Sequence, residues 1–321
     1  MKLHAMNLKK NGLIPLPPDR KDRIIGTWYA VAAFLLWGVL PVYWKGLQEV
    51  PASEILPYRI IGSFLFLAVF NWVKKRGPAL REAYSSPLNR LSSLITAVII
   101  GTNWFIFIWA VNAGYIVEIS LGYYINPLLS VFLGIVFLKE RLSFWQTFAL
   151  LLAVASVLFM TIRHGRIPWI ALSLAFTFGI YGLLRKTARV GAVTGLTAET
   201  AVLSPASLVF LVILGIQGGS SLGNASASVH LLLFGAGIVT ATPLVWFARG
   251  ARRIPLSTVG FIQYLAPTCH LILGVFLYHE PFTATHAVSF TLIWIALLIY
   301  SVSKTRFMQR LKPGSLKNLQ R

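Results

Sequence analysis

Long apolar stretches separated by short polar segments run through the chain from residue 25 to residue 303. A helix needs about 20 apolar residues to cross the hydrocarbon core of a bilayer. The pattern therefore predicts an all-α integral membrane protein with ten transmembrane helices. The predicted spans cover residues 25–45, 54–73, 91–112, 116–138, 143–162, 167–186, 194–216, 230–248, 256–278 and 283–303.

The composition agrees with a membrane location. Hydrophobic residues make up 56% of the 321 positions and charged residues only 12%, with a mean hydropathy of +0.72. A soluble domain carries roughly twice that share of charge. The single cysteine, Cys269, lies within the ninth predicted span, so the chain has no intrachain disulfide.

The net charge of +20 is concentrated in alternate polar segments. If the N-terminus is cytoplasmic, 25 of the 29 lysines and arginines lie on the cytoplasmic side, and the outer loops keep only Lys45, Arg163 and Arg166. The positive-inside rule therefore predicts that both termini are cytoplasmic. This distribution favours contact with anionic lipid headgroups and disfavours a nucleic-acid partner.

The second half of the chain repeats the first. At an offset of 140, the segment SLGYYINPLLSVFLGIVFLKER aligns with GFIQYLAPTCHLILGVFLYHEP, and at an offset of 141 the first span aligns with the sixth. The identical pairs in the first alignment are Tyr124/Tyr264, Pro127/Pro267, Leu133/Leu273, Gly134/Gly274 and Glu140/Glu280.

Each copy contains five predicted helices, an odd number, so the second copy should enter the membrane from the opposite side. The sequence thus predicts two inverted five-helix repeats, 25–163 and 164–303, between a cytoplasmic arm at 1–24 and a basic tail at 304–321. Inverted repeats are typical of secondary transporters, whose substrate site lies near mid-membrane between the halves.

Two prolines that recur in both copies, Pro127 and Pro267, should bend their helices, because each removes an amide donor and clashes with the carbonyl four residues earlier. Irregular backbone survives in a membrane only where protein or water satisfies it. The two bends either line a cavity or are kinks sealed by neighbouring helices.

Polar residues that do not recur are the better candidates for binding an asymmetric ligand. Tyr123, Asn126 and Ser130 share one helical face, and Gln263 and His270 occupy the equivalent face of the other copy. An unpaired amide in hydrocarbon costs several kcal/mol, so Asn126 and Gln263 must face a cavity or form interhelical hydrogen bonds. His270 has the same two readings, and Tyr264, beside Gln263, is included in the predicted cavity.

The first and third spans contribute two further candidates. Asn103 lies near the middle of its span, whereas Asn112 points to the opposite face near the outer end, so Asn103 is the preferred cavity residue. Trp37, one turn before Pro41, either stacks on a planar substrate or packs against other helices, and Trp104 and Trp109 have the same two readings. Trp28 and Trp44 are expected in the interfacial aromatic belt.

Three charged residues lie within predicted spans, and such groups are candidates for function. Glu54 and Glu199 each lie near the start of the second helix of a repeat, where a carboxylate also stabilises the positive end of the helix dipole. They are the acidic candidates for proton coupling. Arg59 has no charged counterpart in the other copy, and could reach the interface, pair with Glu54 or meet an anionic substrate.

Five blocks of sequence are distinctive: WGVLPVYWK, PASEILPYRI, GTNWFIFIWAVN, EISLGYYINPLLSVFLG and STVGFIQYLAP, with GYYINPL and FIQYLAPT the most specific. They resemble the RarD permeases, within the ten-helix EamA-type branch of the drug/metabolite transporter superfamily. The resemblance extends over about residues 25–303. It implies an inner-membrane carrier of small organic molecules, built from two inverted five-helix repeats.

Taken together, these features predict a secondary transporter that moves small organic metabolites or drugs by alternating access, with no cofactor. The sequence has no GxxxxGK[ST] phosphate loop, and neither HExxH nor GxSxG, so ATP hydrolysis and membrane-enzyme chemistry are disfavoured. A channel-like or structural subunit of a larger complex is the main alternative.

Overall fold

The computed structural model describes residues 19–113, 115–165, 167–279, 283–303, 305 and 308. In this part of the chain the regular elements are helical. The long helices are α2 (Arg20–Lys45), α3 (Ala52–Val73), α5 (Pro87–Asn112), α6 (Ile116–Leu138), α7 (Phe144–His164), α8 (Trp169–Thr187), α9 (Ala192–Ile216), α10 (Ala227–Ala251) and α13 (Ala284–Val302). The shorter ones are α4 (Gly77–Ser85), the 3-10 turn η1 (Ser221–Asn224), α11 (Leu256–Gln263), α12 (Leu265–Ile272) and the π-helical turn η2 (Leu273–Leu277).

Nine helical segments of the described residues are long and apolar enough to cross a membrane, so the chain is a multi-pass membrane protein. The ninth predicted span is one of them, although it is divided among α11, α12 and η2. The sixth predicted span forms the 19-residue helix α8 but falls outside this set, because Arg185 and Lys186 lie in its last turn and lower its hydropathy. Apart from residues 305 and 308, the predicted tail lies outside the described residues, as do all but the last six residues of the predicted arm.

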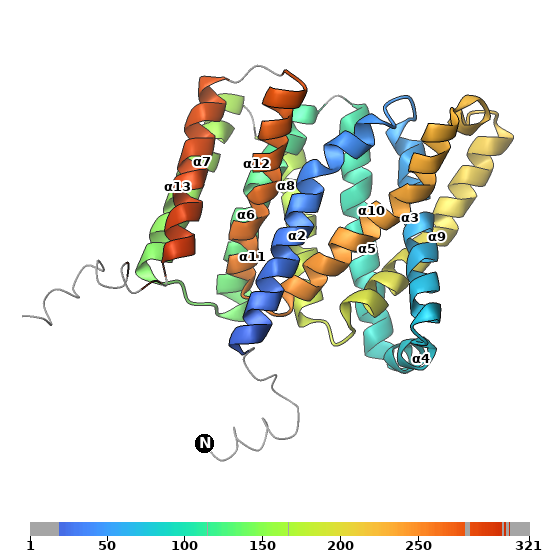
Figure 1. The fold of residues 1–321 in the computed structure, drawn as a ribbon, viewed down its shortest axis with the longest axis horizontal. Coiled ribbons are helices and arrows are strands. Elements are labelled where there is room, and N and C mark those ends of the chain that lie inside the picture. The colour runs from blue at the N-terminus through green and yellow to red at the C-terminus, as the bar shows by residue number, and fades with distance from the viewer. Residues whose placement is uncertain are drawn as a thin grey trace, which may run out of the picture.

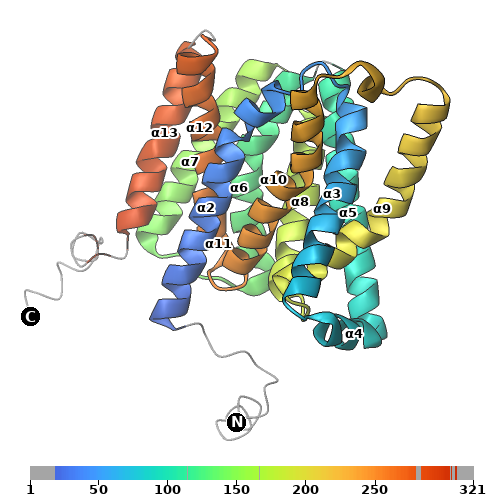
Figure 2. The ribbon, with the colours of Figure 1, turned by 45° about the vertical axis from the view of Figure 1, so that its right-hand side comes forward.

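The helices run side by side between two ends of a bundle (Figure 1). We call the end where α2 begins the lower end, as Figure 1 draws it, and the end where α2 finishes the upper end. Figure 2 shows α7 and α13 together at one edge, with α3, α5 and α9 toward the other and α4 lying crosswise at the lower end. Apart from Arg59 within α3, the described lysines and arginines lie at the lower end except for Lys45 and Arg163.

Helix ends at the lower end are stabilised by side chains of adjacent segments. Ser143 begins α7 with a capping box, exchanging hydrogen bonds with Gln146. Glu140, just after α6, accepts hydrogen bonds from the backbone N–H groups of Leu256 and Ser257 at 2.6 and 2.9 Å, the first two residues of α11. This carboxylate caps a helix of the second half from a loop of the first half, where the helix dipole favours a negative charge.

The short helix α4 is attached to the start of α9 at the lower end. The Tyr84 hydroxyl donates to the Thr194 carbonyl at 2.9 Å. Burial raises the pKa of the Tyr84 phenol above its ordinary value, so the hydroxyl keeps its proton and remains a donor throughout the neutral range.

Helices α3 and α10 cross with their backbones in contact. A Cβ at Gly237 would lie 2.1 Å from the carbonyl carbon of Gly62, and the Ser63 hydroxyl donates to the Gly237 carbonyl at 3.0 Å. Small residues that allow this approach are the usual basis of helix association in membranes. The crossing therefore requires glycine at position 237.

We expect Gly237→Ala to lower the stability of the protein, because its methyl group would collide with the α3 backbone. Overpacking of this kind costs about 1–3 kcal/mol. The measurement is thermal unfolding of the detergent-purified protein. The matched control is Gly215→Ala in α9, where an added Cβ meets nothing within 4 Å, and where alanine should be neutral or stabilise by up to about 1 kcal/mol. Equal unfolding temperatures for the two variants would contradict the assignment.

Candidate functional site

A cavity of about 500 Å³ lies among the helices of both halves of the chain. Its walls run from the middle of the bundle to residues at the upper end, including Lys45 at the end of α2 and Tyr278 after η2. The predicted residues that line it are Trp37, Arg59, Asn103, Tyr123, Asn126, Gln263 and His270. Further lining residues are Phe34, Leu40, Pro41, Trp44, Trp104, Phe107, Val111, Ile119, Ser120, Gly122, Leu174, Phe178, Thr240, Leu244 and Ala266.

Asn126 and Gln263 both line the cavity near the crossing of α6 and α11. Gly260 makes the crossing possible, since a Cβ there would lie 2.6 Å from the Pro127 carbonyl oxygen. The Gln263 amide donates to the Ser130 hydroxyl at 2.9 Å. Within the described residues, the side-chain oxygens of Asn126 and Gln263 are buried without a hydrogen-bond partner. Such groups are costly in a membrane unless water or a ligand donor satisfies them.

The two recurring prolines behave differently in the two halves. Pro127 lies inside α6, which continues as one helix from Ile116 to Leu138. In the second half the helix is interrupted at Tyr264, three residues before Pro267, and continues as α12 and then as the π-helical turn. Only the second proline therefore accompanies a break in its span.

His270 has a structural partner that the sequence reading did not identify. Pro41 removes the amide that would otherwise bond to the Trp37 carbonyl. The His270 Nε2 atom lies 3.2 Å from that carbonyl oxygen and donates to it, so α12 satisfies the backbone group that α2 leaves free. The imidazole also packs edge-on against the ring of Tyr123, with centroids 5.4 Å apart.

Arg59 reaches the cavity from α3. Its Nε donates to the Thr240 hydroxyl of α10 at 3.1 Å, and its guanidinium carbon lies 4.8 Å from the ring centre of Trp44 and 5.7 Å from that of Trp104. Trp44 therefore also lines the cavity, next to the upper end of α2, and its place in the interfacial belt stays a prediction. The expected alternative of an ion pair with Glu54 is not formed.

Asn103 links two walls of the cavity. Its amide nitrogen donates to the Leu174 carbonyl at 3.0 Å and to the Thr177 hydroxyl at 2.8 Å, both on α8. Both N–H groups are thus used to hold α5 against α8. Asn103 therefore both lines the cavity and forms interhelical hydrogen bonds, the two roles that the sequence allowed for buried amides.

An aromatic cluster forms the floor of the cavity toward the lower end. Trp37 lies 5.1 Å from Phe34 and 5.8 Å from both Phe178 and Phe247, measured between ring centres. Tyr181 stacks on Phe247 at 6.4 Å and is fully buried on the side of this floor that faces away from the cavity. These five rings come from α2, α8 and α10 and close the cavity on that side.

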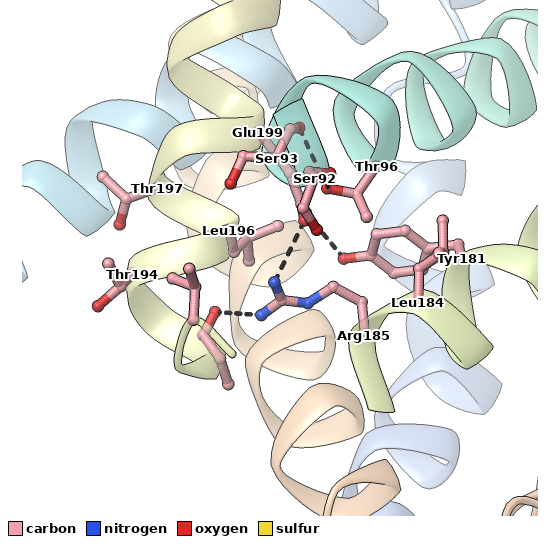
Figure 3. Close-up of polar contacts among 12 residues, drawn as sticks. Ser92, Ser93, Thr96, Tyr181, Leu184, Arg185, Thr194, Leu196, Thr197 and Glu199 are labelled. Carbon is pink, nitrogen blue, oxygen red and sulfur yellow. Dashed lines mark hydrogen bonds and ion pairs between the residues drawn. The ribbon is translucent and has the colours of Figure 1, made fainter. Parts of the chain in front are cut away.

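Glu199 forms a polar network with Tyr181 and Arg185 (Figure 3). It does not line the cavity, and Tyr181 lies between it and the other rings of the floor. It accepts a hydrogen bond from the Tyr181 hydroxyl at 3.0 Å and forms an ion pair with Arg185 at 3.4 Å. Arg185 also donates to the Gly191 carbonyl at 3.2 Å, and its guanidinium lies over Gly195, where a Cβ would be 2.0 Å from Nη1. The network fixes the end of α8 to the start of α9.

Three other predicted residues also lie outside the cavity. Glu54 is buried and accepts hydrogen bonds from the Ser220 hydroxyl and the Ser221 backbone N–H, so it caps η1 of the second half. Ser130 lies behind the wall, where it positions Gln263. Tyr264 faces α6 from the break in span nine, and its hydroxyl donates to the Tyr124 carbonyl at 3.3 Å.

The described residues include no cluster of His, Cys, Asp or Glu that could hold a metal ion. Sequence reasoning missed Arg185 and Tyr181 as partners of Glu199, because Arg185 was counted with the basic loop residues. The available signal was Gly195, four residues before Glu199, because a position without a side chain leaves room for the Arg185 guanidinium. Lys45 and Tyr278 were missed as lining residues because positions at the end of a span have many possible roles.

Several bacterial proteins have sequences similar to this chain. The chain is 44% identical over 291 residues to "Uncharacterized transporter YojE" of Bacillus subtilis, a match that covers 89% of this chain and 97% of the relative. It is 42% identical over 282 residues to "Protein RarD" of Escherichia coli, covering 88% and 95%. It is 28% identical to "Chloramphenicol-sensitive protein RarD" of Pseudomonas aeruginosa, covering 89% and 96%.

The fold also has a counterpart among solved structures. One crystal structure aligns with a TM-score of 0.69 at 18% sequence identity, covering 88% of this chain and 99% of the other. The EamA-like transporter family matches this sequence twice, at residues 24–162 and 166–302. The chain therefore belongs to the EamA-like transporter family, as a transporter of the RarD type.

Proposed function

We propose that the protein carries small organic molecules across the inner membrane by alternating access, and that the 500 Å³ cavity is its substrate site. The observation that carries the proposal is that both halves of the chain build this cavity around the crossing of α6 and α11. Pockets of 300–1,000 Å³ suit small organic ligands. The unpartnered oxygens of Asn126 and Gln263 would accept hydrogen bonds from a solute or its water.

The proposal includes ten spans arranged as two inverted repeats, with α8 as the sixth span. The pattern of helix packing supports it, since exchanging the two halves reproduces the same neighbours. Helix α2 packs on α10 as α8 packs on α5, α3 packs on α10 as α9 packs on α5, and α6 packs on α8 as α11 and α12 pack on α2. The double match to one family agrees with a duplicated unit.

We further propose that the lower end of the bundle is cytoplasmic and carries both termini. The described basic residues at that end support this orientation by the positive-inside rule. Their charge would also attract anionic lipid headgroups of the inner leaflet. In this orientation the cavity extends toward the outer face and the aromatic floor separates it from the cytoplasm.

For the cavity to open to the cytoplasm, the rings of the floor would have to move apart and the Glu199 network would have to break. Tyr181 belongs to both, because its ring packs under Phe178 and Phe247 while its hydroxyl donates to Glu199. Glu199 therefore acts in closing the lower end. Glu199 does not line the cavity, so this role involves no direct contact with the substrate.

Counterflow in proteoliposomes tests the transport proposal. Vesicles loaded with one unlabelled metabolite from a panel should take up the same labelled compound in a saturable manner. Asn126→Ala and Gln263→Ala should each reduce this exchange about 10-fold or more, because each removes a polar contact in the site. Steady conductance without saturation or counterflow would instead indicate a channel-like protein and would refute the proposal.

Asn71→Ala is the matched control for the amide variants. Asn71 is a buried amide in α3 that donates to the Leu67 carbonyl and the Thr197 hydroxyl, away from the cavity. Exchange per reconstituted molecule should be retained in this variant. If all three amide variants lose exchange equally, the loss reflects general packing and the cavity is not the substrate site.

We expect Glu199→Ala to destabilise the protein by about 3–5 kcal/mol, because it leaves Arg185 buried without its partner. The double variant Glu199→Ala/Arg185→Met should lose less than the sum of the single losses, as measured by thermal unfolding. Glu49→Ala, at an exposed carboxylate, should be neutral. A Glu199→Gln variant that is fully stable but loses the pH dependence of exchange would assign Glu199 to proton coupling instead.

A further inference from the structure

The charged groups that line the cavity are all basic. Arg59 reaches it from α3 and Lys45 lies near its upper end, whereas the described lining residues include no Asp or Glu. Arg59 is about 10 Å along its helix from the first residue, at 1.5 Å per residue. A cation at this depth is expensive and usually pairs with another group or faces water.

The contacts of Arg59 leave most of its donors available. Its Nε is bonded to Thr240, and among the described residues no carboxylate pairs with the guanidinium. A guanidinium presents paired N–H groups that match the oxygens of a carboxylate, sulfonate or phosphate. Among the described residues no carboxylate side chain takes this position beside the guanidinium. An anionic group of a ligand would supply the missing oxygens.

Aromatic rings surround the guanidinium. Trp44 and Trp104 lie within 6 Å of it, and Phe107 and Tyr278 line the same cavity. The two indole rings hold the cation by cation–π contact. The remaining aromatic surface suits stacked or edge-to-face contact with a flat ring.

On the basis of the transport function proposed above, we propose that the cavity selects small organic anions that carry a planar aromatic group. Arg59 binds the anionic group, and the rings of Trp44, Trp104 and Phe107 contact the planar part. Lys45, whose ammonium lies 3.9 Å from the ring centre of Tyr278, attracts the anion at the upper end of the cavity.

A set of matched sulfonate probes tests this selection on the full-length wild-type protein. The probes are benzenesulfonate, neutral benzenesulfonamide, cationic benzyltrimethylammonium and the saturated anion cyclohexanesulfonate. Binding is measured by thermal stabilisation in detergent, because a ligand that binds only the folded state raises the unfolding temperature. We expect benzenesulfonate to bind about 10-fold or more tightly than each of the other three.

Substitutions then identify the group that recognises the charge. Arg59→Gln should weaken benzenesulfonate binding about 10- to 100-fold while leaving benzenesulfonamide unchanged, as expected for loss of a charge-assisted hydrogen bond. Arg59→Lys should recover part of the preference for the anion. Lys45→Gln should slow association and reduce its salt dependence. The control is Arg163→Gln, an exposed arginine at the upper end outside the cavity, which should have no effect.

The outcomes separate this inference from the transport proposal. Equal or tighter binding of the neutral or cationic probe by the wild type would overturn the anion assignment, even if other solutes show saturable counterflow. Equal binding of cyclohexanesulfonate would overturn the aromatic part. Absence of counterflow for every solute would refute transport, while the binding series would still decide the selectivity of the cavity.

Discussion

Helices α6 and α11 cross with their backbones in contact. Gly260 permits this contact, because a side chain at that position would collide with the carbonyl oxygen of Pro127. That contact brings the polar faces of the two halves together, since Gln263 lies one turn from Gly260 and bonds to Ser130 of α6. Glu140 holds the same pair of helices at the lower end by capping α11. The cavity is the space that remains on the other side of this crossing.

The surroundings of a membrane protein explain why so many polar residues in these helices have specific partners. Lipid satisfies no hydrogen bond, so each backbone group freed by a proline or a helix end needs a protein partner or water. His270 donates to the Trp37 carbonyl, which Pro41 leaves without a backbone donor. Lys186 donates to the Ala251 carbonyl at the end of α10 at 2.9 Å. In both cases a side chain from one helix completes the backbone of another, so the polar residues also determine how the helices associate.

Much of this architecture could be predicted from the sequence, because apolar length and helical periodicity are local properties. Each predicted span corresponds to a helical segment, and the face shared by Tyr123 and Asn126 does line the cavity. The partners of polar residues were harder to predict, since they depend on contacts between distant segments. Arg185 could not be assigned to Glu199 without the turn that folds α9 back on α8, and the 133-residue separation of Ser130 and Gln263 hides their bond. The contact of Trp44 with the cavity was not predicted, because an indole near a helix end suits both an interface and a ligand wall.

The backbone contact between α3 and α10 has a mechanical consequence. Gly62 and Gly237 leave no clearance, and the Ser63 hydroxyl locks the same turn. Arg59 and Thr240 lie one turn away from this contact, on α3 and α10 respectively, and are joined by a hydrogen bond. Sliding or rotation of one helix on the other would cause steric overlap, so this contact favours movement of α3 and α10 as one unit. In the alternating access proposed above, Arg59 would therefore keep its hydrogen bond to Thr240 while the cavity changes shape.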